Sequence, residues 1–161
     1  MRVEQLMSRN IHTCDIEADL SRVAQLMWEH DCGCIPIVDA DDTLIGVITD
    51  RDVAMAAYMQ GKPLAQICAA DVMAKPVHTC RPDEDVSVAQ KRMRDHQLRR
   101  LPITDSNGSL IGVLSLNDLA LEASRERGPG VRPQVRAVDI AETLAVISRH
   151  RGASQIVLAA E

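Results

Sequence analysis

The chain has 161 residues, of which 46% are hydrophobic and 25% charged, so it lies in the ordinary globular range and can bury one core or two small ones. A net charge of -5 and the absence of phenylalanine, with only Trp28 and Tyr58 as aromatic residues, argue against a nucleic-acid partner. No apolar run reaches 18 residues and the N-terminus has no signal-peptide pattern, so we expect a cytoplasmic protein without a membrane partner.

The first helix and hairpin follow from the hydrophobic pattern. Asp19 is placed to cap a helix in which Leu20, Val23, Ala24 and Met27 form one apolar stripe. Two apolar runs, 35–38 and 44–48, flank a polar turn and predict a β-hairpin. A second helix is expected from Asp50 to about Gln60, where Gly61 ends it.

The same pattern then returns. Residues 6–54 align with residues 72–120 at a constant offset of 66, without a gap and with roughly 17 identities in 49 positions. The second copy has Asp85 as its helix cap and Asn107-Gly108 in its hairpin turn. We therefore divide the chain into a first repeat (1–60), a connecting segment (61–70), a second repeat (71–124) and a C-terminal tail (125–161).

Each copy is predicted to be a β-α-β-β-α unit of a mixed α/β (α+β) fold. One copy of about 50 residues covers its sheet poorly, so the pair is the expected folding unit. Between the copies we expect a short helical stretch from Leu64 to Ala70. In the tail we expect a flexible break at 125–130 and an amphipathic helix near 139–150, because Asp139 and Glu142 have capping-box spacing. This helix packs on its own module or on a dimer mate, or it contacts another protein.

A motif at the junction of strand and helix occurs twice. It runs from Gly46 to Asp52 and from Gly112 to Asp118, and reads Gly, two aliphatics, a hydroxyl residue, two variable positions, then Asp. One copy is simply a good helix start, but two copies in register inside a repeat indicate a function.

With the apolar-Pro-apolar elements Ile35-Pro36-Ile37 and Leu101-Pro102-Ile103, these motifs make residues 2–122 resemble the tandem CBS (cystathionine β-synthase type) domain family. The resemblance implies two repeats paired about a pseudo-twofold axis as a Bateman module. It also implies two clefts that bind AMP, ADP, ATP or S-adenosylmethionine, assembly into a disc-shaped homodimer, and a regulatory rather than enzymatic role with an unknown effector protein.

The resemblance also implies the ligand contacts. Asp52 and Asp118 would accept hydrogen bonds from the ribose hydroxyls, because charge-assisted bonds are the stronger ones. Thr49 and Ser115 would bind phosphate at the helix N-termini. Main-chain groups would hold the adenine near Ile35, Pro36, Leu101, Pro102, Thr13 and Thr79.

The two clefts differ in charge. Arg99 and Arg100 precede Leu101 in the second repeat, whereas Gly33 and Cys34 occupy the matching positions of the first. Guanidinium groups bind phosphate bidentately, so we expect the cleft next to these arginines to prefer the more highly charged ligand. Alternatively, they are surface charges on a strand edge.

Three other classes of protein are weighed: a metal- or redox-responsive protein, an enzyme and a ligand-free dimerisation scaffold. The run His30-Asp31-Cys32-Gly33-Cys34 and the pairs His12/Cys14 and His78/Cys80 favour a metal- or redox-responsive protein, although zinc knuckles are absent. The five cysteines fit structural thiols in a reducing compartment. An enzyme is not indicated, because no nucleophile has an assignable base and no phosphate-binding glycine loop occurs. A ligand-free dimerisation scaffold is the third. We expect no cofactor and no structural metal.

Overall fold

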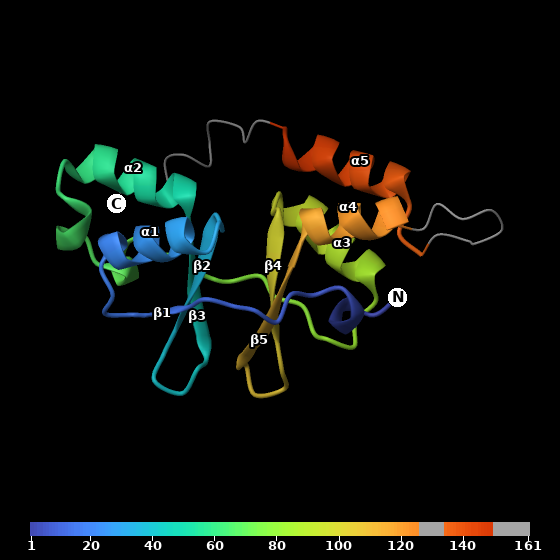
Figure 1. Cartoon of the computed structure of the whole chain (residues 1–161), viewed down its shortest axis with the longest axis horizontal. Helices are drawn as coiled ribbons and strands as arrows, with labels where there is room; N and C mark the ends of the chain where they lie inside the picture. The colour runs from blue at the N-terminus through green and yellow to red at the C-terminus, as the bar shows by residue number, and fades with distance from the viewer. Residues whose placement is uncertain (126–133, 150–161) are drawn as a thin grey trace.

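The computed structural model describes residues 1–125 and 134–149 and consists of two similar halves side by side (Figure 1). Each half has a β-hairpin and a pair of helices, which confirms the mixed α/β fold of β-α-β-β-α repeats. The elements of the first half are β1 (Cys14–Asp15), α1 (Leu20–Glu29), β2 (Cys34–Val38), β3 (Leu44–Thr49) and α2 (Asp50–Gln60). Those of the second half are α3 (Val86–His96), β4 (Arg100–Thr104), β5 (Leu110–Ser115), α4 (Leu116–Arg125) and the additional helix α5 (Ala137–Ile147).

The predicted caps form as the residue types require. The side chain of Asp19 accepts a hydrogen bond from the Arg22 amide at 2.9 Å and begins α1, and Asp85 accepts from the Ser87 amide at 2.9 Å and begins α3. Gly61 ends α2 with φ of 60°, a left-handed conformation that glycine adopts without strain. Both helices therefore start and α2 ends where the sequence predicts.

The two sheets are small and nearly identical. In the first, β1 pairs with β2 in parallel and β2 pairs with β3 antiparallel, with Ile35 opposite Ile48. In the second, β4 and β5 form the same hairpin, and a single parallel bridge from Cys80 to Ile103 replaces the short first strand. The Cα registers of the two hairpins match position for position at the offset of 66, so the repeat in the sequence is a repeat in space.

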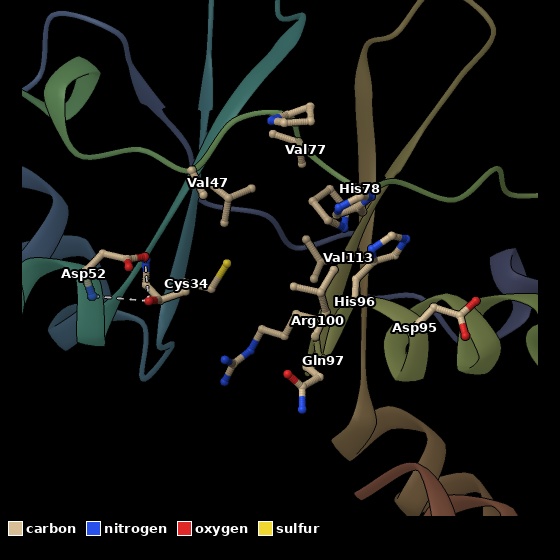
Figure 2. Close-up of a pocket in the computed structure, with 15 residues that line it drawn as sticks. Cys34, Val47, Asp52, Val77, His78, Asp95, His96, Gln97, Arg100 and Val113 are labelled. Carbon is tan, nitrogen blue, oxygen red and sulfur yellow. Dashed lines mark hydrogen bonds between the residues drawn. The ribbon is translucent and has the colours of Figure 1, made fainter. Parts of the chain in front are cut away.

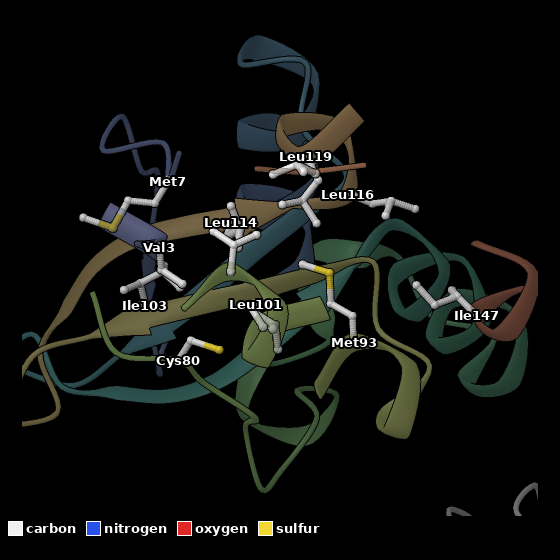
Figure 3. Packing of buried hydrophobic residues seen from close by; sticks show 13 residues of the cluster. Val3, Met7, Cys80, Met93, Leu101, Ile103, Leu114, Leu116, Leu119 and Ile147 are labelled. Carbon is white, nitrogen blue, oxygen red and sulfur yellow. The ribbon is translucent and has the colours of Figure 1, made fainter. Parts of the chain in front are cut away.

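Each half borrows a segment from the other copy. Val3 and Met7, from the N-terminal end of the first repeat, lie in the buried core of the second half (Figure 3). Ala69 and Met73, their counterparts at the offset of 66, lie in the core of the first half. The exchange is mutual, so neither half has a complete core without the other, as the prediction of a paired folding unit requires.

Isolated bridges join the exchanged segments to the sheets. Ser8 pairs with Val113 of β5, and Ala74 pairs with Val47 of β3. The tips of the two hairpins also meet, through a bridge from Thr43 to Ser109. These reciprocal contacts relate the halves by the expected pseudo-twofold axis.

Two expectations about helices need correction. The stretch from Leu64 to Ala70 is not one helix but two 3-10 turns, Leu64–Gln66 and Ala69–Asp71, because the carbonyl of Ile67 between them accepts a hydrogen bond from the Leu20 amide at 2.9 Å. Helix α5 begins two residues before Asp139, whose carboxylate pairs with Arg136 instead of capping the helix.

Parts of the tail prediction fall outside the described ranges. Residues 126–130 of the expected break and residue 150 of the expected helix belong to this group, whereas Arg125 is the last residue of α4. Within residues 1–125 and 134–149, no helix has both the length and the apolar character needed to span a bilayer.

Candidate functional site

A cavity of about 370 Å³ lies between the two halves (Figure 2). Its volume falls in the range of small-molecule sites. Both repeats contribute to its walls, so it exists only in the pair. The lining residues are Cys34, Val47, Thr49, Asp52, Ala74, Pro76, Val77, His78, Asp95, His96, Gln97, Leu98, Arg100, Pro102 and Val113.

The carboxylate of Asp52 is the acidic group at the α2 end of this cavity. Its Oδ2 accepts hydrogen bonds from the amide of Thr49 at 2.8 Å and from the Thr49 hydroxyl at 2.7 Å. The Asp52 amide in turn donates to Thr49 Oγ1 at 3.3 Å, which completes a capping box. Among the described residues nothing donates to Oδ1 of Asp52, so this oxygen is available to a ligand hydroxyl.

The Thr49 hydroxyl is committed to the same capping box. It donates its proton to Asp52, and a contact with phosphate through that proton requires this bond to break. The pair Ser115 and Asp118 repeats the arrangement, with a bond of 2.6 Å between Ser115 Oγ and Asp118 Oδ2. The two hydroxyls predicted to hold phosphate are therefore first of all helix caps.

Arg100 reaches from β4 of the second half toward the first half. A Cβ placed on Gly33 would lie 3.6 Å from its Nη2 and 3.1 Å from Oδ2 of Asp50, so the guanidinium and this carboxylate lie on the same side of Gly33. Figure 2 shows the Arg100 side chain pointing toward Cys34 and Asp52. Arg99 is exposed and does not line the cavity, so only the second of the two predicted arginines belongs to it.

Cys34 places a thiol in the wall of the cavity. Burial raises the pKa of this thiol to about 11, against the opposing effect of the nearby Arg100 charge. The group is therefore a neutral, weakly polar surface at neutral pH.

Histidines form a stacked pair in each half. His78 and His96 line the cavity with ring centroids 3.5 Å apart, and His12 and His30 stack at 3.3 Å at the equivalent positions. Desolvation, with the positive charges of His96 and Arg92 nearby, lowers the pKa of His78. His30 follows the last residue of α1 and His96 is the last residue of α3, and each stacks on the histidine of its own extended segment.

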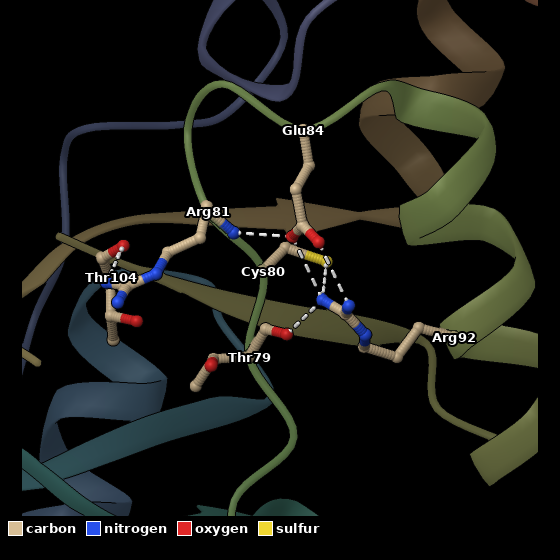
Figure 4. A network of polar contacts seen from close by, with 6 residues as sticks. All are labelled: Thr79, Cys80, Arg81, Glu84, Arg92 and Thr104. Carbon is tan, nitrogen blue, oxygen red and sulfur yellow. Dashed lines mark hydrogen bonds and ion pairs between the residues drawn. The ribbon is translucent and has the colours of Figure 1, made fainter. Parts of the chain in front are cut away.

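A polar network holds the His78 segment against the second half (Figure 4). Arg92 of α3 donates to both carboxylate oxygens of Glu84 at 3.0 Å, and it also donates to the carbonyl of Thr79. The hydrogen bond from Arg92 lowers the pKa of Glu84. The first half has Leu26 and Ala18 at the matching positions, so this anchor is specific to the second repeat.

The other predicted contact residues lie as follows. Pro102 lines the cavity, whereas Ile35 and Leu101 are fully buried core residues that do not line it. Thr13 lines a separate hollow beside Arg9 and Ser109. Neither of these two cavities is lined by Pro36, Thr79, Ser115 or Asp118.

Sequence reasoning missed several members of the cavity wall. Val47 and Val113 were placed on strands but not at a site, and His78, His96 and Gln97 come from a helix end and an extended segment. For the two valines the signal was present in the sequence, because each directly follows the glycine of its motif and the motifs recur at the offset of 66. The crossing of segments between halves was not visible in any local pattern.

The fold and the cavity define a paired-repeat module with a cavity between its repeats. The CBS domain model matches residues 3–58 and 69–125, so this chain belongs to the CBS domain family, with two CBS domains.

Curated relatives agree with this assignment. The chain is 33% identical over 128 residues to the CBS domain-containing protein YhcV of Bacillus subtilis (strain 168), which covers 80% of the chain and 89% of YhcV. It is 38% identical over 117 residues to the uncharacterized protein MK0525 of Methanopyrus kandleri; this match covers 73% of the chain and only 60% of MK0525.

Solved structures share the fold. Hypoxic Response Protein I, with two coordinated zinc ions, is 26% identical, with a TM-score of 0.69 over 75% of this chain and 98% of that one. The CBS domain pair of MJ0100, in complex with 5-methylthioadenosine and S-adenosyl-L-methionine, is 22% identical, with a TM-score of 0.71 over 79% and 98%. CBSX2 in complex with AMP is 23% identical, with a TM-score of 0.69 over 77% and 96%.

Proposed function

We propose that the chain is a regulatory module that binds an adenosine-containing ligand, of the AMP, ADP, ATP or S-adenosylmethionine class, in the Thr49–Asp52 cleft. The observation that carries the proposal is the Asp52 carboxylate, held by its capping box at one end of a cavity that both repeats enclose. CBS pairs in complex with AMP and with S-adenosylmethionine support this ligand class.

Asp52 is suited to the ribose. Its Oδ2 is fixed by two hydrogen bonds, which orient Oδ1 before any ligand arrives. A preoriented carboxylate accepts a hydroxyl hydrogen bond at a lower ordering cost than a mobile one. One or both vicinal hydroxyls of a ribose can donate to it.

The base and the charged group of the ligand would contact different walls of the cavity. Val47, Val77 and Val113 supply apolar surface for a purine, with main-chain groups beside Pro102 for its edge. Arg100 supplies the positive charge for a phosphate or a carboxylate, in place of the Thr49 hydroxyl, which is engaged. This refines the expected preference for a charged ligand to a single arginine.

The Ser115–Asp118 cleft remains a second predicted site. Its capping box matches that of the first, but its counterpart of Arg100 is Cys34. A ligand bound there would meet less positive charge. We expect it to be the weaker site for nucleotides.

The function follows from the position of the cleft between the repeats. A ligand that contacts both halves favours the arrangement it fits and shifts the population by its differential affinity. We infer a non-enzymatic, cytoplasmic regulator that passes this change to an effector protein.

The two aspartates provide a matched test by calorimetric titration of AMP and ATP. Asp52→Ala and Asp118→Ala remove the same capping box from equivalent helices, so their costs in stability should agree. Loss of a charge-assisted bond costs roughly 1.5–3 kcal/mol, so Asp52→Ala should weaken binding in the cavity about tenfold or more. Asp118→Ala should leave that binding event unchanged. Wild-type protein that binds neither these nucleotides nor S-adenosylmethionine would leave the scaffold interpretation.

The arginines test the charge preference. Arg100→Ala should weaken ATP more than adenosine, whereas Arg99→Ala, outside the cavity, should affect neither. Equal losses for ATP and adenosine in Arg100→Ala would remove its role in charge recognition.

Metal binding is a second candidate function, favoured by the stacked pairs His12–His30 and His78–His96 and by the zinc ions of Hypoxic Response Protein I. Within residues 1–125 and 134–149, no group of three or more metal-ligating side chains comes together. Elemental analysis of protein purified without chelator decides this. Stoichiometric zinc would support it, and its loss in His78→Ala would locate the site.

A further inference from the structure

Helix α5 is an addition to the second half. It packs against α3 and α4 (Figure 1), whereas α2 of the first half is followed by two 3-10 turns. Thr143 and Ile147 on its inner side are buried, and Ile140 is half-buried against the same core. Val138 and Leu144 on its outer side are exposed. The second half therefore carries a helix that the repeated fold does not require.

The side of α3 beneath α5 carries polar side chains. Arg94 donates from Nη1 to the Thr143 hydroxyl of α5 at 3.0 Å. Gln90 lies one turn earlier on the same side of α3, is only 6% exposed, and its Nε2 has no hydrogen-bond partner among the described residues. A buried amide without a partner costs free energy that contact with water would return. Since a permanently covered helix face is normally apolar, this face is suited to a helix that can leave.

Gln97 connects α5 to the cavity. Its side chain is part of the cavity wall (Figure 2), and its Nε2 donates to the carbonyls of Val146 and Arg149, both at 3.1 Å. The last four carbonyls of a helix have no partner within the helix, so this amide satisfies the C-terminal end of α5. One side chain therefore touches both the candidate site and the additional helix.

The backbone of Gln97 is fixed by the repeat, whereas its side chain is particular to the second half. Gln97 has φ of 52°, and Asp31, its counterpart at the offset of 66, has φ of 48°. The bend after the helix is therefore common to both halves. Asp31 is exposed, and an aspartate side chain is one methylene shorter and has no N–H donor. The difference between the halves at this position is thus a side chain that can rotate and donate.

We propose that Gln97 couples the docking of α5 on the second half to ligand binding in the Thr49–Asp52 cleft, an inference that rests on the proposed function. A ligand in the cleft fills the space into which the Gln97 side chain would otherwise turn, so it keeps the amide on the end of α5 and lowers the ordering cost of docking. Helix α5 is then the element through which the ligand state changes the surface of the protein.

Hydrogen exchange of the α5 amides, followed by mass spectrometry on the full chain, tests the coupling. The probe is whichever of AMP, ATP and S-adenosylmethionine binds wild type in calorimetry, at saturating concentration. Couplings between sites are typically roughly 5–150-fold, and two neutral hydrogen bonds correspond to the lower end, so the ligand should slow exchange in residues 140–149 about fivefold. Gln97→Met keeps a long side chain in the cavity wall but has no donor. It should bind the ligand, exchange faster in α5, and lose the effect of the ligand on that exchange.

Linkage is reciprocal, so detachment of α5 must weaken ligand binding by the same factor. Ile147→Asp places a charge on the buried side of α5 and should weaken binding about fivefold in calorimetry. Val138→Asp makes the same kind of change on the exposed side of the helix and should leave the affinity unchanged. Circular dichroism in the far ultraviolet checks that both variants are folded. If Ile147→Asp does not fold, Ile140→Asp, at a half-buried position of the same side, takes its place.

The outcomes separate this inference from the proposed function. Wild type that binds none of the three ligands overturns the proposed function and the coupling with it. A ligand that binds wild type but leaves the exchange of α5 unchanged overturns the coupling alone. The same holds for a ligand effect on α5 that survives in Gln97→Met, and for equal affinities of Ile147→Asp and Val138→Asp.

Discussion

A glycine is needed at position 46 of the first motif for a steric reason, and the addition of one methyl group tests it. A Cβ on Gly46 would lie 2.2 Å from Sδ and 2.7 Å from Cγ of Met73, the residue that the start of the second repeat inserts into the first core. No real Cβ makes such contacts, so Gly46→Ala must displace Met73. Overpacking of this kind costs typically about 1–3 kcal/mol.

The net effect is smaller than the clash because alanine is favoured over glycine in a strand. That preference is worth roughly 0.5–1 kcal/mol, so we expect Gly46→Ala to lower the free energy of unfolding by about 1–2 kcal/mol. For a chain of this size, the melting temperature should fall by roughly 2–8 °C. Urea unfolding of the purified protein measures the free energy directly.

A double-mutant cycle identifies the cause. Met73→Ala alone is a large-to-small core change and should cost about 2–5 kcal/mol. In its presence Gly46→Ala should cost much less than in wild type, since Sδ and Cγ of residue 73 are gone and only its Cβ, at 2.9 Å, remains close. Gly61→Ala is the control, because its φ of 60° makes it strained while no atom lies within 4 Å of its Cβ, so its cost should not depend on Met73. Equal costs of Gly46→Ala with and without Met73 would refute the steric explanation.

Two further predictions concern charge and reactivity. Arg92→Leu, which copies the residue at the matching position of the first repeat, should destabilise the protein by about 1 kcal/mol at pH 7. Folding lowers the pKa of Glu84, so the pair stabilises the protein above the unfolded pKa and loses this effect as the pH falls through the lower folded value. The difference in stability between wild type and variant should therefore shrink in acid unfolding, and a constant difference down to pH 2 would contradict this. With a pKa of about 11, Cys34 should alkylate slowly at pH 8 and faster toward pH 10, as measured by peptide mass spectrometry, and rapid modification at pH 8 would show that the thiol is not buried in the cavity wall.

Local pattern was enough for the repeated elements of the fold. The caps Asp19 and Asp85, the stop at Gly61 and both hairpins lie where sequence predicted them, because each depends on neighbours within a few residues. The prediction of a helix from Leu64 to Ala70 was wrong because the carbonyl of Ile67 accepts a hydrogen bond from the Leu20 amide. These two residues are 47 positions apart in the sequence. Contacts of that kind leave no periodicity in a single sequence.

The candidate site was predictable in part for the same reason. The motif located Asp52 and Thr49, and the difference between the repeats drew attention to Arg100. The sequence could not indicate that the Thr49 hydroxyl is bound to Asp52, that Arg99 points elsewhere, or that His78 stacks on His96. Those facts depend on which side chains the exchanged segments bring together.

Because of the exchange of segments, the unit that is repeated in the sequence differs from the structural half that has a complete core. The first half in space begins after Ser8 and ends near Met73, and the second half needs Val3 and Met7 from the other end of the chain. A cut at the boundary between the sequence copies would give two fragments, each carrying a core residue of the other. The two copies therefore complete each other's cores, and neither fragment alone contains all the residues of one core.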